Sequence, residues 1–303
     1  MARLQWNRLL VRIAGIALLA GCGGAQSTVP AGVAVQPQTT RRAPAGDLLY
    51  VVGHTATWAY VYVLSFPAGR VVYKISKQIT GLCSDRQGNV YMTQSFQSTS
   101  TIFVYRHGAK KPMATLSDPD NGAASCAVNP KTGDLGVGNV EGGTLLIYPH
   151  GQGKPKRYYL WLSPNDLTYD SEGNLFVLGG NSYATLGELI NGKFKRVILS
   201  PHVPNPTGLQ WDGKHIAVGG EAGSSSYYYY GQINRYAIDA RKGSLKGSTT
   251  LSTDAARFFV RGSTLIVSDG YTLYFFSYPA GGEPTKTIKD VDEPGSMTVS
   301  VAP

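Results

Sequence analysis

The chain has 303 residues, of which 42% are hydrophobic and only 16% are charged, and it contains 37 glycines and 19 tyrosines. It is long enough to bury a substantial core as one domain, and no helical periodicity competes with strand patterns after residue 45. The formal net charge is +9, but three of these charges belong to an export segment at the N-terminus. We expect this segment to export the body of the chain and therefore expect no nucleic-acid partner.

Residues 1–21 have the form of a secretory signal peptide. Arg3, Arg8 and Arg12 precede the apolar run "IAGIALLAGC", which is too short to span a bilayer. The end of this run, LAGC, resembles the lipobox of bacterial lipoproteins, in which the cysteine is acylated, with palmitate among its chains, and becomes the first residue of the mature chain. The resemblance implies lipidation of Cys22, a membrane anchor and a cell-envelope location. A plain cleaved signal and an ordinary cysteine are the alternatives.

Residues 22–45 are small, polar and proline-bearing, and they show no periodicity. Such a segment cannot bury enough apolar surface to become ordered, so we interpret it as a lipid-anchored flexible linker. Its typical reach is roughly 27 Å.

From residue 46 onward a turn phrase recurs between short apolar runs. Because glycine accepts positive φ and Asp or Asn can hydrogen-bond its own backbone, each copy predicts a tight turn in a hairpin. Copies include "GLCSDRQGNVYMT" (81–93), "SCAVNPKTGDLGVGN" (125–139), "DLTYDSEGNLFVLGG" (166–180) and "GLQWDGKHIAVGG" (208–220). The turn glycines that align are Gly46, Gly88, Gly133, Gly173, Gly213 and Gly262.

A second phrase follows each turn, as in "LSFPAGRVVYKI", "LIYPHGQGKPKRYYL" and "FSYPAGGEPTKTI". It predicts an aromatic-ended strand, a Pro/Gly turn and another strand. One repeat is therefore four short strands in about 40–49 residues, which is the size of a β-propeller blade.

The first copy, at Gly46, lacks the strand that precedes the turn elsewhere, and "PGSMTVSVAP" at the C-terminus resembles that strand, with Met297 in the place of Leu82. We therefore predict an all-β fold: a six-bladed β-propeller of four-stranded antiparallel blades over residues 46–303, with the first blade closed by the C-terminal strand. Closure leaves the ring without an open seam.

The D-x-x-G-N and Y-P-x-G turns resemble those of NHL-repeat and gluconolactonase-like six-bladed propellers. This resemblance covers roughly residues 46–303 and implies the architecture, since related propellers include lactonases, streptogramin-type lyases and binding scaffolds. Both repeated turns would lie on one face of the ring. We expect function on the other face, where the connections are irregular.

Gluconolactonase-like enzymes hold a divalent metal at the channel mouth with Glu, Asn and Asp, so the resemblance implies Ca²⁺ or another divalent ion as a cofactor. Loop residues that could converge there are Glu141, Asn165, Asp166, Asn181, Glu221 and Asp269. No pair of them matches the spacing of the family's metal motif, and such side chains more often cap turns. The five histidines are scattered, and His107 and His150 occupy equivalent turns, which argues against a lyase.

A run of four tyrosines, Tyr227, Tyr228, Tyr229 and Tyr230, lies among serines and glycines. It predicts either a hairpin tip that exposes rings to a sugar, peptide or protein, or a strand whose alternate rings pack on a neighbouring blade. Cations recur in phase on the outermost strand of each repeat. Lysine there prevents edge-to-edge pairing of sheets; contact with anionic lipid or polysaccharide is the alternative.

Once Cys22 is lipidated, Cys83 and Cys126 remain in an oxidising compartment. The repeat alignment places Cys126 at the position of Leu82, so the two cysteines are offset by one residue on the innermost strands of adjacent blades. Side chains of opposite parity either point at each other or both point away. We predict a disulfide because blades converge toward the channel, with buried free thiols as the alternative.

The sequence thus predicts an envelope-anchored binding or scaffold propeller, a monomer that recognises an unknown protein or saccharide on its variable loops. The alternative is a metal-dependent lactonase-like hydrolase. No G-x-S-x-G or H-E-x-x-H motif supports catalysis, so an enzyme is the less favoured interpretation and the catalytic residues are unknown.

Overall fold

A computed structural model of the protein describes residues 45–303, apart from residues 56–57, 97–98, 181–182 and 223–229. Cys22, Asn181 and the tyrosines at 227–229 therefore lie outside the described residues, as do the predicted signal peptide and all but the last residue of the predicted linker. The described fold is all-β, and its only helical element is a short 3-10 turn, η1 (Pro149–Gly151). No helix within the described residues is long and apolar enough to cross a membrane.

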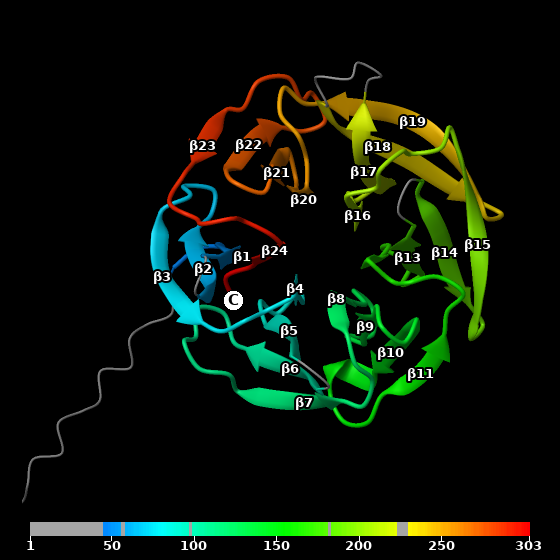
Figure 1. Ribbon diagram of the computed structural model, residues 1–303, viewed down its shortest axis with the longest axis horizontal. Coiled ribbons are helices and arrows are strands. Elements are labelled where there is room, and N and C mark those ends of the chain that lie inside the picture. Colours follow the sequence, from blue (N-terminus) through cyan, green and yellow to red (C-terminus); the bar gives the residue numbers. More distant parts are fainter. Residues whose placement is uncertain (1–44, 56–57, 97–98, 181–182, 223–229) are drawn as a thin grey trace, which may run out of the picture. The chain divides into compact units, whose positions relative to one another are not determined.

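The strands form antiparallel sheets that surround a central channel in a β-propeller-like arrangement (Figure 1). Four of the sheets have four strands each. Given from the channel outward, these are β24 (Met297–Ser300), β1 (Leu48–His54), β2 (Ala59–Ser65) and β3 (Val71–Ser76); β4 (Gly81–Ser84), β5 (Val90–Phe96), β6 (Thr99–Tyr105) and β7 (Ala114–Asp118); β8 (Ala123–Val128), β9 (Leu135–Asn139), β10 (Thr144–Tyr148) and β11 (Lys156–Tyr159); and β20 (Arg257–Arg261), β21 (Thr264–Ser268), β22 (Leu273–Ser277) and β23 (Lys286–Ile288).

The fifth sheet has eight strands because two four-stranded halves share an outer edge. One half is β12 (Asp166–Tyr169), β13 (Leu175–Gly179), β14 (Thr185–Ile190) and β15 (Lys193–Ser200). The other is β16 (Gly208–Trp211), β17 (Ile216–Ala222), β18 (Tyr230–Asp239) and β19 (Lys242–Thr250). Residues 198–200 of β15 pair in parallel with residues 242–244 of β19. The sequence predicted separate four-stranded sheets, and this pairing of two otherwise open edges corrects that expectation.

The C-terminal strand closes the first sheet, as the sequence predicted. β24 pairs antiparallel with β1, with Met297 opposite Val51 and Ser300 opposite Leu48. All four residues of β24 are buried. The last strand of the chain is therefore the innermost strand of the sheet that begins the ring.

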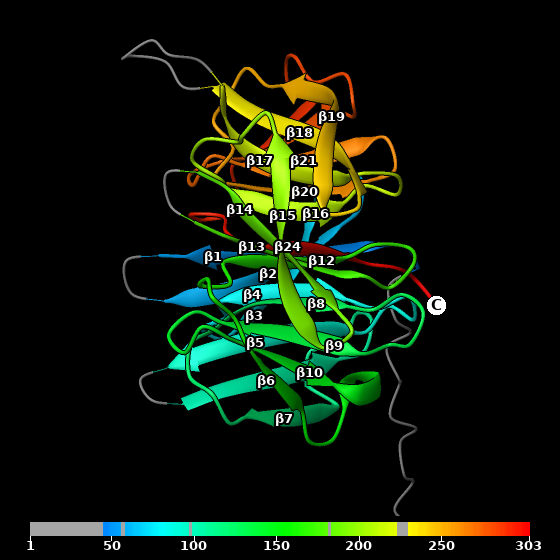
Figure 2. The same ribbon diagram turned by 90° about the vertical axis from the view of Figure 1, so that its right-hand side faces the viewer.

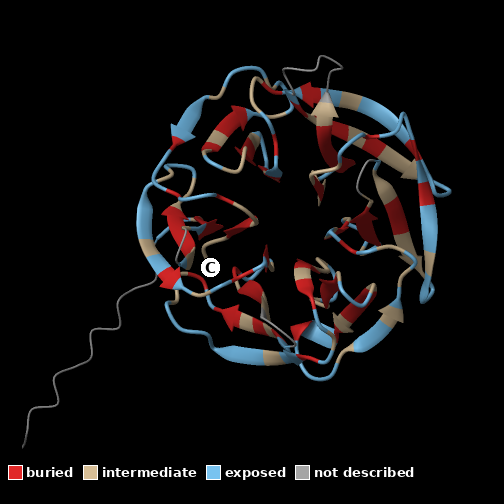
Figure 3. Ribbon diagram, viewed as in Figure 1, coloured by how far each residue is buried: buried red, intermediate tan, exposed pale blue. Residues whose placement is uncertain are grey.

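Adjacent sheets pack face to face, and the core lies between them. Alternate residues of β1 point to opposite neighbours, since strand side chains alternate between faces. Tyr50 belongs to a buried cluster that includes Met92 of the following sheet, whereas Val51 belongs to one that includes Ile266 of the last sheet. Figure 3 shows the inner strands buried and the outermost strands mostly exposed.

The ring has two chemically different faces. We call turn face the one that carries the repeated turns, whose glycines 46, 88, 133, 173, 213 and 262 all have positive φ, as predicted. We call variable face the opposite one, formed by the connections between the second and third strands of each sheet and between sheets. The variable face is on the left in Figure 2, and the C-terminus is on the other side. The described chain also begins on the turn face, where Asp47 Oδ1 accepts a hydrogen bond from the Ala302 amide (3.0 Å).

Candidate functional site

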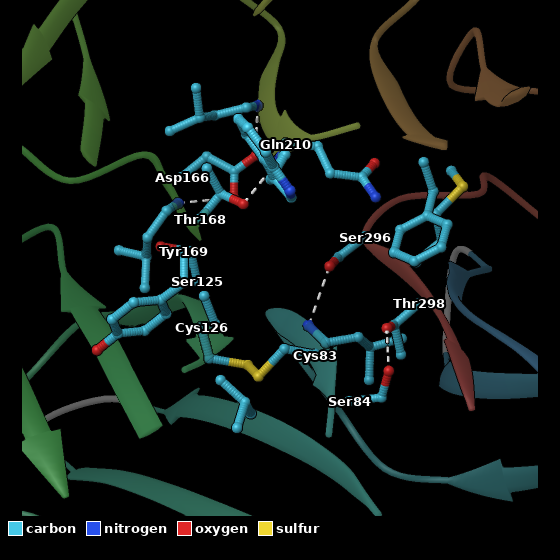
Figure 4. A pocket seen from close by; sticks show the side chains of 18 of the residues that line it. Cys83, Ser84, Ser125, Cys126, Asp166, Thr168, Tyr169, Gln210, Ser296 and Thr298 are labelled. Carbon is cyan, nitrogen blue, oxygen red and sulfur yellow. Dashed lines mark hydrogen bonds between the residues drawn. A yellow bond between two sulfur atoms is a disulfide. The ribbon is translucent and has the colours of Figure 1, made fainter. Parts of the chain in front are cut away.

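The innermost strands contact each other in the cyclic order β24, β4, β8, β12, β16, β20 and so form the wall of the channel. The predicted disulfide lies in this wall and joins β4 to β8 (Figure 4). The Cα atoms of Cys83 and Cys126 are 5.6 Å apart, within the range that a disulfide requires. Convergence of the sheets toward the channel therefore brings the two cysteines together, as the repeat alignment predicted.

The channel-side edges of the innermost strands are not paired in a sheet, so side chains of neighbouring strands satisfy some of their backbone groups. Ser296 Oγ accepts a hydrogen bond from the Leu82 amide at 3.0 Å. In the same way, Asp166 Oδ2 accepts from the Leu209 amide at 2.8 Å. Figure 4 shows both contacts across the channel wall. Polar side chains in the channel thus hold successive innermost strands together.

One position recurs in every innermost strand, directly before the first core residue. The residue at this position pairs with an equivalent residue on the next strand of its own sheet. Asp166 pairs with Leu178, and Gly208 pairs with Gly219. Only two of the occupants carry a charge. In ring order they are Ser296, Gly81, Ser125, Asp166, Gly208 and Arg257.

Asp166 and Arg257 both line the channel and its mouth on the variable face. Burial raises the pKa of Asp166, while the positive charge of Arg257 and the amides of Leu209 and Leu167 oppose that shift. Arg257 Nη1 donates to the Thr207 carbonyl at 2.7 Å. The ion pairs among the described residues do not include Asp166 or Arg257. The mouth therefore holds two opposite charges that are near each other but not joined.

The mouth is a cavity of about 420 Å³ that shares several lining residues with a channel cavity of about 320 Å³. Its wall is mixed in character. The polar lining residues include His54, Thr80, Asn165, Thr207 and Ser296, and the apolar ones include Val52, Ile79, Val140, Leu178 and Pro206. Such a concave site with a few convergent polar groups has the character of a small-molecule site.

Exposed aromatic side chains gather on the variable face. Every exposed aromatic residue in the described part of the chain lies at the variable-face end of a strand or in a connection there: Trp58 (64% exposed), Tyr159 (76%), Trp161 (50%), Tyr183 (64%), Tyr230 (44%) and Tyr271 (79%). The large exposed apolar residues elsewhere are aliphatic, such as Val72 and Met113. Aromatic rings with a polar edge are typical of recognition surfaces.

The residues predicted from the sequence for this face are dispersed. Asn165 and Asp166 lie at the channel mouth, whereas Glu141 lines a separate hollow with Asp120 and Arg157. Glu221 accepts a hydrogen bond from Asn205, and Asp269 caps the amides of Tyr271 and Thr272. Within the described residues, no group of three or more His, Cys, Asp or Glu is arranged to hold a metal ion.

Sequence reasoning missed Arg257 and most of the exposed aromatics. Arg257 stands in the same column as Asp166 when the repeats are aligned, and that column was the available signal. Trp58, Tyr183 and Tyr271 each occur alone in a loop, so they form no run like that of the tyrosines at 227–230. Tyr230 is the only member of that run within the described residues, and its side chain is exposed.

No protein-family model matches the sequence, and no curated protein matches it in a sequence search. Solved structures do match. A candidate 6-phosphogluconolactonase from Bacteroides fragilis has 12% identity and a TM-score of 0.56, with 87% of this chain and 99% of that chain covered. A chain of the nidogen/laminin complex has 12% identity and a TM-score of 0.62, with coverage of 84% and 99%.

A protein of unknown function from Bacteroides caccae matches with 10% identity and a TM-score of 0.60, over 84% of this chain and 99% of that chain. At such low identity the similarity shows the propeller fold alone. The matching structures include candidate lactonases and a chain from a protein–protein complex. The fold alone therefore does not distinguish a catalytic from a binding function.

Proposed function

We propose that the chain is an envelope-anchored binding propeller that recognises its ligand on the variable face. One observation carries the proposal: all exposed aromatic side chains among the described residues lie on that face, which also holds the channel mouth with Asp166 and Arg257. Aromatic residues and arginine are enriched at binding surfaces because they combine large contact area with directed polar groups. The ligand is a saccharide or a protein segment.

We infer six blades from the ring of innermost strands. Each half of the eight-stranded sheet has the order and antiparallel pairing of the separate four-stranded sheets, and only three residue pairs join β15 to β19. Counting the halves separately gives one blade for each innermost strand. Six blades are also the number that the sequence repeats indicate.

We further propose that lipid on Cys22 anchors the protein to a membrane. Both ends of the described chain lie on the turn face, so a tether that precedes residue 45 joins the propeller on that face. The variable face would then point away from the membrane and toward partners in the envelope. Mass spectrometry of the mature N-terminus tests the anchor, which requires acylated Cys22 as the first residue.

A lactonase-like hydrolase is the second candidate function, because two of the matching structures are candidate 6-phosphogluconolactonases. The observation that favours it is a carboxylate, Asp166, in a concave mouth beside a guanidinium. Such a carboxylate is a possible general base. Hydrolysis of a sugar lactone with and without added Ca²⁺ tests this function, and a rate that falls in an Asp166→Asn variant would support it.

The binding function is tested with the full chain carrying Cys22→Ser, which removes the lipid site. The fluorescently labelled protein is applied to panels of immobilised glycans and of peptides. The test variant is Trp58→Ser/Tyr271→Ser, and the matched control is Val72→Ser/Met113→Ser, which removes exposed apolar side chains away from the variable face. We expect the test variant alone to lose the bound ligand. Equal binding by both variants would contradict the proposal.

A further inference from the structure

The carboxylate of Asp166 carries a negative charge that its contact with the next strand does not require. Ser296 occupies the equivalent position directly before β24 and caps the amide of Leu82 with a neutral hydroxyl. Asp166 caps the equivalent amide, that of Leu209, with a carboxylate oxygen. Asp166 Oδ1 also accepts a hydrogen bond from the amide of Leu167 at 2.9 Å. Since a hydroxyl is sufficient for the contact between strands, that contact does not explain the negative charge at position 166. Its partial burial is instead unfavourable, because a charge that is withdrawn from water loses hydration.

Arg257 supplies the opposite charge over the same piece of backbone. Its Nη1 donates to the carbonyl of Thr207, and Asp166 accepts from the amide of Leu209, so both side chains reach the segment 207–209 from the strands on either side. Gly208 lies between them, and a Cβ there would stand 3.5 Å from Asp166 Oδ2. Within the described residues, Arg257 Nε and Nη2 have no hydrogen-bond partner.

From this arrangement we propose that the channel mouth binds a free α-amino acid, with the ligand ammonium at Asp166 and the ligand carboxylate at Arg257. The inference deepens the proposed binding function, on which it rests, by naming a ligand class for the mouth of the variable face. The guanidinium offers two free donors to a carboxylate, and a charge-assisted pair of this kind is strong and directional.

The chemistry of the mouth favours a zwitterion over a simple anion or cation. A carboxylate ligand alone would leave the negative charge of Asp166 uncompensated, and an amine alone would leave the positive charge of Arg257 uncompensated. Complementary charges on one ligand compensate both. The apolar wall formed by Val52, Ile79 and Leu178 suits a hydrophobic side chain. Leucine is therefore a suitable probe.

Isothermal titration calorimetry with three matched probes tests the proposal on the full chain carrying Cys22→Ser. The probes are leucine, 4-methylpentanoate, which lacks the amine, and 3-methylbutylamine, which lacks the carboxylate. We expect leucine to bind at least about tenfold more tightly than either analogue. Asp166→Ser keeps the amide cap and should weaken leucine binding at least about tenfold, and Arg257→Gln should do the same. Arg86→Gln, in the turn-face part of the channel, should leave it unchanged.

Asp166→Asn serves as a second variant if Asp166→Ser does not fold, because the amide has the same size and keeps an acceptor for Leu209. The proposal is overturned if 4-methylpentanoate binds as tightly as leucine, or if leucine binding survives both substitutions at position 166. It is also overturned if leucine, alanine and phenylalanine all fail to bind wild type at millimolar concentration. In that case the proposed binding function would still stand if the Trp58→Ser/Tyr271→Ser variant failed to bind a glycan or peptide that wild type binds.

Discussion

The two faces of the propeller differ in how regularly their residues repeat around the same ring. On the turn face, glycines in left-handed conformation and Asp or Asn caps recur in nearly every repeat, as at Asp85 and Asp170, whose carboxylates accept amides within their own turns. On the variable face the connections differ from repeat to repeat, and exposed aromatic rings and the Asp166–Arg257 pair are found there. The comparison indicates that stability is distributed over the repeated parts, whereas the recognition that we propose is concentrated where the repeat is broken.

Deletion of residues 296–303 should have the largest effect on stability. It removes β24, whose four residues are all buried, together with its pairing to β1 and the bond from Ser300 Oγ to the Gly88 carbonyl. The loss is comparable with the whole stability of a domain, about 5–15 kcal/mol. We expect the cooperative transition in circular dichroism to disappear. An unchanged melting curve would show that the C-terminal strand is dispensable.

Removal of the disulfide should cost less. The bond joins residues 43 apart in sequence, and a crosslink of that length contributes about 3–4 kcal/mol in the chain-entropy model. The variant is Cys83→Ala/Cys126→Ala, measured by urea denaturation without reductant. Thiol counting on denatured, unreduced wild type is the control, and two titratable thiols would contradict the bond.

Two turn-face glycines should respond differently to the same substitution. Gly88 has a φ of +81°, and a Cβ there would lie 2.2 Å from the Val301 carbonyl oxygen. Gly213 has a φ of +100°, and nothing lies within 4 Å of its Cβ position. We expect Gly88→Ala to destabilise the fold by about 2–4 kcal/mol and Gly213→Ala by about 1–2 kcal/mol. Equal losses in urea denaturation would mean that backbone strain alone decides the outcome.

A buried carboxylate at the variable-face end of β7 should make stability depend on pH. Burial raises the pKa of Asp118 from its ordinary 3.8 to about 6. Because the folded state holds this proton more tightly than the unfolded state, the stability from Asp118 is present below pH 3.8 and is lost as the pH rises through about 6. Asp118→Asn should therefore be more stable than wild type above that range, by up to about 3 kcal/mol.

The two proteins should have the same stability near pH 3.8, where Asp118 keeps its proton in the folded state. Thermal unfolding of both proteins across this pH range provides the measurement. A difference between them that does not change with pH would contradict the assignment to Asp118.

The sequence was a good guide where the repeat is regular. The aligned turn glycines all have positive φ, β24 closes the first sheet, and Cys83 meets Cys126. Each of these features depends on position within a repeat, which an alignment of the chain with itself reveals. The parallel pairing of β15 with β19 could not be predicted in this way. It depends on how far two outer strands extend and on their relative position in space.

The candidate site was harder to predict for a related reason. Asp166 was selected as a loop carboxylate, but its partner Arg257 lies two strands away around the ring and 91 positions later in the chain. Closeness of this kind follows only from the closed ring. Single aromatic residues such as Trp58 and Tyr271 form no local sequence pattern. They indicate a binding surface only once the structure shows that they are exposed on the same face.

The smallest expected effect provides the most direct test of the central claim, that the charges of the variable face serve recognition and not stability. Differential scanning calorimetry compares wild type with Asp166→Ser, in which the hydroxyl keeps the cap on Leu209 as Ser296 does on Leu82. We predict a change in the free energy of unfolding within about 1 kcal/mol, because relief from the desolvated charge offsets the lost hydrogen bond from the Leu167 amide to Asp166 Oδ1. A loss as large as that expected for Gly88→Ala would contradict the account and would place Asp166 among the residues that hold the ring together.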